Sequence, residues 1–89
     1  MKLKWTHQAF GDRDAIMDHI TKDSVLAALE MDERIANAVE NLVPFPQMGR
    51  LGRVKGTREL VVTKSDFIVA YRLDEGRGDI VSLRVIHGA

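Results

Sequence analysis

The stretch GRVKGTRELVV, residues 52–62, gathers three basic side chains just before an apolar, β-branched segment. Arg53, Lys55 and Arg58 lie within six positions of one another, and Glu59 follows them directly. A guanidinium presents a planar fork of donors that binds a phosphate or a carboxylate through two parallel hydrogen bonds. The stretch is therefore a candidate for catalysis on a phosphodiester, for docking an anionic partner, or simply for the solvated start of a strand.

Arginines further along the chain extend this basic cluster. If the three C-terminal strands pair, we expect Arg58, Arg72 and Arg84 to converge on the sheet face that no helix covers. The alternative is that they form cross-strand ion pairs with Glu59 and nearby aspartates on a solvated face, where each pair contributes little. Both interpretations stay open on this evidence. The candidate partner-binding residues are Arg50, Arg53, Lys55, Arg58, Arg72 and Arg84.

The charge of the chain is balanced overall but unevenly distributed. The 89 residues include 13 basic and 13 acidic side chains. Residues 1–45 carry 5 basic and 8 acidic side chains, whereas residues 46–89 carry 8 basic and 5 acidic ones. Domains dedicated to nucleic-acid binding usually have a strongly basic pI, which this chain lacks. The basic C-terminal half instead favours an acidic partner.

Side chains suited to metal binding or acid–base catalysis are sparse. The chain has no cysteine, which excludes disulfides and thiolate metal sites. No phosphate-binding, nucleophile or metal-spaced motif is present, so we expect neither a metal nor a cofactor. The three histidines are scattered: His7, His19 and His87. The carboxylates of one predicted helix are expected on a solvated face: Asp12, Asp14 and Asp18.

Two helices are predicted in the first half of the chain. Apolar spacing predicts a helix at 7–21, with Thr6 as its N-cap. A longer amphipathic helix is predicted at 25–43, because apolar residues repeat on one stripe until Pro44 and Pro46. The short break between the helices predicts an antiparallel helical hairpin.

Strand patterns surround this hairpin. An alternating segment predicts a strand at 2–6, and three further strands are predicted at 57–63, 66–73 and 79–87, after a loop at 44–53. Within the 66–73 strand, Phe67, Val69 and Tyr71 alternate on one face and are expected in the core. Short turns between the last three strands require antiparallel neighbours.

These elements predict one α+β domain spanning residues 1–89, in the order β-α-α-β-β-β. The helical hairpin packs on one face of a twisted antiparallel sheet. No segment approaches the ~18 apolar residues of a membrane span. The opening MKLKWTHQ is unlike a signal peptide, so we expect a cytoplasmic protein.

The ordered set of motifs resembles the RelE/ParE superfamily of bacterial toxins. The motifs are W-T-x-x-A entering a helix, FPQMGRLGRVKGTRELVV, the strand FIVAYRL and the terminal VSLRVIHGA. This resemblance implies the toxin of a type II toxin–antitoxin module, held inactive by a cognate acidic antitoxin. It implies one of two cellular targets: RelE-like members cut mRNA on the ribosome, whereas ParE-like members inhibit DNA gyrase.

The resemblance favours the ParE-like branch. RelE-like nucleases carry lysines and an arginine where this chain has Glu59, Val61 and Ile68, by our alignment of the strands. Under the nuclease alternative the chain is a metal-independent endoribonuclease, and its catalytic candidates are Lys55, Arg58, Arg84 and His87. Strand alternation places Arg84 and His87 on opposite faces unless a bulge intervenes.

Family members usually continue past this histidine with an arginine and a short tail. Because the chain stops at Ala89, a third alternative is an inactive or truncated toxin that only binds an antitoxin.

Overall fold

The computed structural model describes residues 1–88 and contains two helices that form a hairpin. Helix α1 spans His7–Thr21, and the Thr6 hydroxyl caps it by accepting a hydrogen bond from the Ala9 amide, as predicted. Helix α2 spans Val25–Glu40, with Ser24 as its N-cap. Neither helix in this described part of the chain is long and apolar enough to cross a membrane.

Helix α2 ends three residues earlier than predicted. The chain leaves the helix at Asn41 and continues in tighter turns, in which the Leu42 and Val43 amides donate to Val39 and Glu40 carbonyls. Val43 precedes a proline, which disfavours the helical conformation. The turns direct Leu42 inward, where its side chain is fully buried.

Five strands form one sheet in the order β1-β5-β4-β3-β2. Their bounds are β1 Lys2–Trp5, β2 Arg50–Leu51, β3 Arg58–Val61, β4 Phe67–Asp74 and β5 Asp79–His87. The predicted α+β class, the β1 position and the three C-terminal strands are confirmed. Strand β2 was expected to be loop; it is a two-residue edge strand that pairs with β3.

The sheet is mixed rather than wholly antiparallel. β1 pairs in parallel with β5, from Lys2 opposite Asp79 to Trp5 opposite Ser82, whereas the other pairs are antiparallel. Short turns determine direction only for strands that they join directly. β1 and β5 are separated by almost the whole chain, so no turn constrained the direction of β1.

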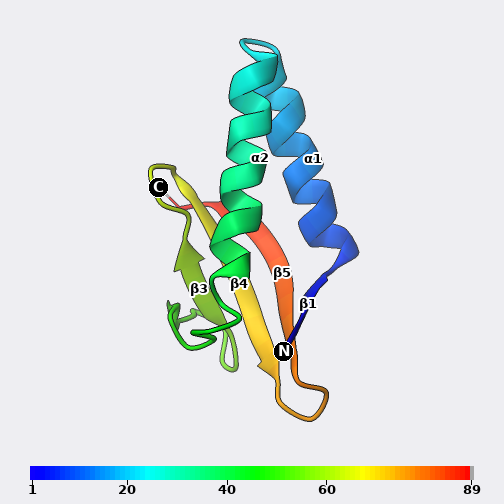
Figure 1. Cartoon of the computed structure of the whole chain (residues 1–89). Coiled ribbons are helices and arrows are strands. Elements are labelled where there is room, and N and C mark those ends of the chain that lie inside the picture. Colours follow the sequence, from blue (N-terminus) through cyan, green and yellow to red (C-terminus); the bar gives the residue numbers. More distant parts are fainter. Residues whose placement is uncertain (89) are drawn as a thin grey trace.

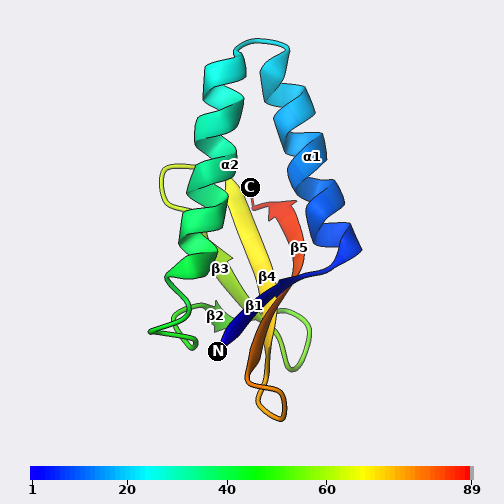
Figure 2. The ribbon, with the colours of Figure 1, turned by 45° about the vertical axis from the view of Figure 1, so that its right-hand side comes forward.

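The hairpin covers one face of the sheet, and the opposite face has no helical layer (Figures 1 and 2). Ile35 and Val39 of α2 pack on Val69 and Val85 of the sheet and on Val62, which directly follows β3. A second cluster joins buried residues below the end of α2: Leu42, Leu60, Tyr71 and Ile80. The predicted burial of Val69 and Tyr71 is confirmed, and Phe67 packs on the same core.

Helix α1 also protects the part of β5 that β1 does not reach. Beyond Ser82, a bulge at Leu83 shifts the register, so that Ala70 faces Arg84 while Tyr71 faces Ser82. The Thr6 hydroxyl donates to the Leu83 carbonyl at 2.8 Å, and the Val85 amide donates to Asp12 at 2.8 Å. The N-cap side chain and a side chain within α1 thus satisfy β5 backbone groups that would otherwise be exposed.

Candidate functional site

Strand register places a row of polar side chains across the open face of the sheet. Arg50 lies opposite Glu59, Glu59 opposite Ala70, and Ala70 opposite Arg84. Residues directly opposite each other in adjacent strands point to the same face. Two arginines therefore flank a central carboxylate and a small residue on the face that carries no helix.

Glu59 is the centre of this row. Its side chain is nearly covered, yet it accepts hydrogen bonds from the Arg53 amide and from the Arg50 guanidinium, both at 3.2 Å. The Arg53 guanidinium lies 3.7 Å from the same carboxylate. The Arg53 amide bond and the Arg50 bond lower the pKa of Glu59, although burial opposes this. Glu59 is consequently charged at neutral pH and offsets part of the local positive charge.

Arg84, at the far end of the row, is bound to helix α1. Its guanidinium donates two hydrogen bonds to Asp12, at 2.9 and 3.1 Å. The Arg84 hydrogen bond lowers the pKa of Asp12, assisted by the Val85 amide. The expectation that Asp12 lies on a merely solvated helix face is therefore wrong, because this carboxylate joins α1 to β5.

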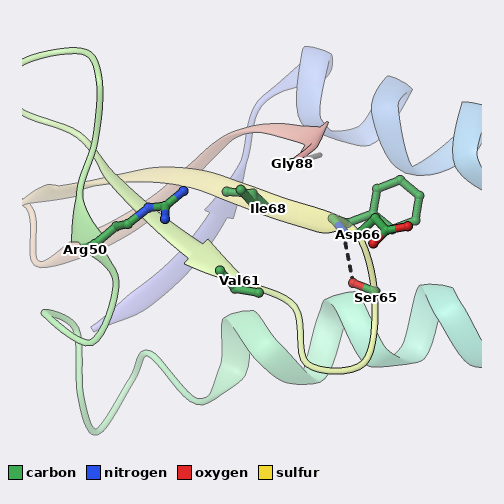
Figure 3. A pocket seen from close by; sticks show the side chains of 7 residues that line it. Arg50, Val61, Ser65, Asp66, Ile68 and Gly88 are labelled. Carbon is green, nitrogen blue, oxygen red and sulfur yellow. Dashed lines mark hydrogen bonds between the residues drawn. The ribbon is translucent and has the colours of Figure 1, made fainter.

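Apolar side chains lie between the charged groups of the open face. A shallow hollow is lined by Val54, Ala70, Leu83 and Ile86, with Arg53 and Arg84 at its rim. A second hollow adjoins it and is lined in part by Arg50, Val61, Ile68 and Gly88 (Figure 3). Figure 3 shows the Arg50 guanidinium directed along the sheet toward Ile68. Such a surface suits a partner with both apolar and acidic groups.

The expected convergence of three arginines on this face is wrong for Arg58. Arg58 lies opposite Tyr71, on the helix-bearing face, and donates to the Gln47 and Gly49 carbonyls. Strand alternation places it with Leu60, which is buried against that face. Arg72 does reach the open face, opposite Val81, and lies 3.7 Å from Asp74.

Two lysines complete the basic surroundings. Lys55 is exposed in the turn between β2 and β3. Lys4 lies opposite Val81, which is itself opposite Arg72, so it also belongs to the open face. Lys4 was not predicted as a site residue, because its place depends on which strand β1 joins. The alternation of Lys2, Leu3 and Lys4 was the available signal.

His87 lies apart from Arg84, as alternation predicted. The bulge occurs at Leu83, before Arg84, so it does not bring the two side chains onto one face. The His87 imidazole packs edge-on against Phe67 at 5.5 Å between ring centres, and it is 60% exposed. The four catalytic candidates therefore do not converge on one point. Lys55 lies in a turn, Arg58 and His87 lie on the helix-bearing face, and Arg84 lies on the open face, bound to α1.

No group of three metal-ligating side chains occurs among residues 1–88. The open face is suited to binding a partner. It presents oriented guanidinium groups beside apolar hollows, with a carboxylate between them.

Comparison with known proteins identifies the family. The model for the ParE toxin of type II toxin–antitoxin systems matches residues 3–89. Toxin RelE2 of Caulobacter vibrioides is 38% identical over 83 residues, which are 93% of this chain and 92% of that protein. Protein Y4kP of Sinorhizobium fredii is 38% identical over 86 residues, which are 97% of this chain and 86% of that protein.

Solved structures agree with this assignment. The chromosomal ParDE toxin–antitoxin system of P. aeruginosa contains a chain with a TM-score of 0.81 and 32% identity, covering 100% of this chain and 97% of the other. The E. coli RelBE toxin–antitoxin complex shares the fold at a TM-score of 0.70 and 10% identity, covering 94% and 92%. The chain therefore belongs to the ParE toxin family of type II toxin–antitoxin systems.

Proposed function

We propose that this toxin acts in the ParE-like manner, by binding DNA gyrase, and that an acidic antitoxin neutralises it in the cytoplasm. The observation that carries the proposal is the ion-paired Glu59 at the centre of the open face. The superfamily resemblance expects a nuclease lysine there. Instead, a carboxylate stands there, paired with Arg50 and Arg53 and offsetting part of their charge.

The chemistry of RNA cleavage supports this preference. Without a metal, a ribonuclease must activate the 2′-oxygen, stabilise the charge on phosphorus and protonate the leaving oxygen at one point. Here Arg84 is bound to Asp12, and His87 lies on the other face. A phosphodiester approaching Glu59 meets guanidinium groups already paired with a carboxylate and, among the described residues around it, no free general base, which favours protein binding over phosphoryl chemistry.

The open face also suits the antitoxin. The ParDE system of P. aeruginosa and the RelBE complex of E. coli are toxin–antitoxin assemblies that contain chains of this fold. We place an amphipathic acidic segment of the antitoxin over the hollow between Arg53 and Arg84. Its carboxylates would contact the exposed basic groups nearby, namely Lys4, Arg50, Arg53, Lys55 and Arg72. Complementary charge accelerates and orients such an association.

Controlled expression in bacteria tests the proposal. We expect growth arrest, relaxation of a reporter plasmid and induction of the DNA-damage response, all prevented by co-expression of the antitoxin. Normal supercoiling together with mRNA cut at defined codon positions would overturn it. If the free toxin does not slow growth but still binds the antitoxin, the alternative of an inactive toxin that only binds an antitoxin would be favoured instead.

The name of the Caulobacter vibrioides relative, RelE2, makes the nuclease the second candidate. Under that candidate, single substitutions of Lys55, Arg58, Arg84 and His87 to alanine should each reduce cleavage of mRNA on the ribosome.

A further inference from the structure

Two exposed apolar patches lie at opposite ends of this elongated molecule, which measures 42 × 24 × 22 Å. The first, the tip patch, consists of Val25, Leu26 and Leu29 on the first turns of α2, where Leu26 is 66% exposed. Figures 1 and 2 show that this end of the hairpin projects beyond the sheet. The second patch lies at the other end of α2, in the segment that follows it.

The tip patch adjoins acidic side chains. Leu26, Leu29, Glu30 and Glu33 follow the i, i+3, i+4, i+7 spacing of one helix face. Within residues 1–88, neither Glu30 nor Glu33 forms an ion pair within 4.0 Å. The neighbouring Arg34 donates to the Lys64 carbonyl and, within the described residues, forms no ion pair with either glutamate. Residues 7–40 as a whole carry three basic and eight acidic side chains.

The second patch, the basic segment, spans residues 43–58 and has the opposite charge. It exposes five large apolar side chains, and the most exposed is Leu51 at 79%. The five are Val43, Phe45, Met48, Leu51 and Val54. The segment contains no acidic residue and four basic ones, namely Arg50, Arg53, Lys55 and Arg58. Only part of this charge is offset, by the single carboxylate of Glu59.

Buried hydrogen bonds hold the basic segment in place. The Tyr71 hydroxyl donates to the Pro46 carbonyl at 2.8 Å and accepts from the Gly49 amide at 2.9 Å. Arg58 donates to the Gly49 carbonyl at 2.8 Å. A Cβ on Gly49 would lie 2.7 Å from the Tyr71 ring, so only glycine fits there. Phe45 and Met48 therefore project from an anchored backbone.

We propose that the tip patch of one copy binds the basic segment of a second copy, in a two-fold symmetric, antiparallel dimer. Two elongated chains that lie side by side in opposite directions bring each tip to the other's basic segment, so the same contact forms twice. Both patches expose apolar side chains, and their charges are opposite, which orients the association. A partner of either charge would match one patch, whereas a second copy matches both.

In the dimer, the second copy covers part of the surface proposed for the antitoxin. An acidic antitoxin would therefore have to displace that copy before it could bind. This consequence rests on the proposed antitoxin site. The dimer itself depends on neither the antitoxin nor the cellular target.

Analytical ultracentrifugation of the purified toxin tests the proposal. We expect a monomer–dimer equilibrium at about 0.1 M salt that shifts toward monomer at about 1 M salt, because the screening length falls from about 10 Å to about 3 Å. A chain that stays monomeric at every concentration, or aggregates without limit, would overturn the proposal.

Charge exchange makes the test specific. One variant carries Glu30→Lys and Glu33→Lys. The other carries Leu51→Glu, Arg53→Glu and Lys55→Glu, which leave two basic and three acidic side chains in residues 43–58. Each alone should weaken dimerisation more than about a hundredfold, because like charges then face each other. Their equimolar mixture should dimerise, since complementary charges meet at both contacts.

Asp14→Lys is the matched control, because it changes charge on an exposed face of α1 away from both patches, and it should dimerise like the parent. Circular dichroism and thermal melting establish that every variant folds. A mixture that remains monomeric while both variants are folded would contradict the arrangement. If the parent is monomeric and the Glu30→Lys, Glu33→Lys variant no longer binds the antitoxin, the dimer proposal is wrong. The tip patch would then be a binding site for the antitoxin.

Discussion

The carboxylate of Glu59 accepts a hydrogen bond from the Arg53 amide at 3.2 Å and lies 3.7 Å from the guanidinium of the same arginine. One side chain thus anchors the turn between β2 and β3 and reduces its positive charge. Because Arg50 binds the other carboxylate oxygen at 3.2 Å, the electrostatic character of the open face depends strongly on this single group.

Removing the charge of Glu59 should make the open face attractive to nucleic acid. We expect Glu59→Gln to bind a short single-stranded RNA more tightly than the parent, with an affinity that decreases steeply with salt. Fluorescence anisotropy measures this, and Glu33→Gln on α2 is the charge-matched control. Equal RNA affinity in the parent and in Glu59→Gln would show that Glu59 does not suppress phosphate binding.

The contact between Asp12 and β5 should contribute measurably to stability. Asp12→Ala leaves the Val85 amide without its acceptor and Arg84 without its ion pair. Loss of a buried hydrogen-bond partner costs about 1–3 kcal/mol. Urea unfolding should report a loss in that range, whereas Asp14→Ala on the exposed side of α1 should change little. Similar stabilities for both variants would contradict the role of Asp12.

Acid should weaken the fold through the same two carboxylates. The Arg84 hydrogen bond lowers the pKa of Asp12 from its ordinary value of 3.8, and the Arg53 amide lowers that of Glu59 from 4.5. A carboxylate whose pKa is lower in the folded state stabilises the fold at pH values above its unfolded pKa. This stabilisation is lost as the pH falls through the folded pKa.

We therefore expect the free energy of unfolding to be nearly constant around neutral pH and to fall below about pH 4.5. Urea titrations at a series of pH values measure it. The double variant Asp12→Asn, Glu59→Gln should show a shallower decline than the parent. An identical decline in both proteins would assign the acid sensitivity to other groups.

Tyr71 should be needed to hold the segment after α2. Tyr71→Phe conserves the ring but leaves the Pro46 carbonyl and the Gly49 amide without their partner. We expect a loss of about 1–3 kcal/mol in stability. Hydrogen exchange of the amides of residues 47–49, above all that of Gly49, should accelerate more than in the helices. Unchanged protection of that segment would show that other contacts suffice to anchor it.

Local patterns predicted most of the elements but not all of their relationships. The bounds of α1 and β5 followed from capping and alternation, because the determining residues are adjacent in sequence. The direction of β1 depends on pairing with a strand 77 positions away, as between Leu3 and Ile80. Strand β2 contains two residues, too few for any alternating pattern.

The sequence predicted which residues belong to the candidate site better than it predicted how they are arranged. The arginines were identified by residue type, and Arg50, Arg53, Arg72 and Arg84 do lie on or beside the open face. Arg58 was misplaced, although alternation had already grouped it with buried Leu60. The contact between Asp12 and Arg84 joins residues 72 positions apart, and nothing in the local sequence around either residue indicates it.

A supercoiling assay with purified gyrase, relaxed plasmid and the purified toxin tests the central claim most directly. The ParE-like account predicts that the toxin inhibits supercoiling in proportion to its concentration, and that prior addition of the antitoxin abolishes the effect. It also predicts that ribosomes programmed with mRNA show no toxin-dependent cleavage. Unimpaired gyrase together with toxin-dependent cleavage of ribosome-bound mRNA would contradict the account.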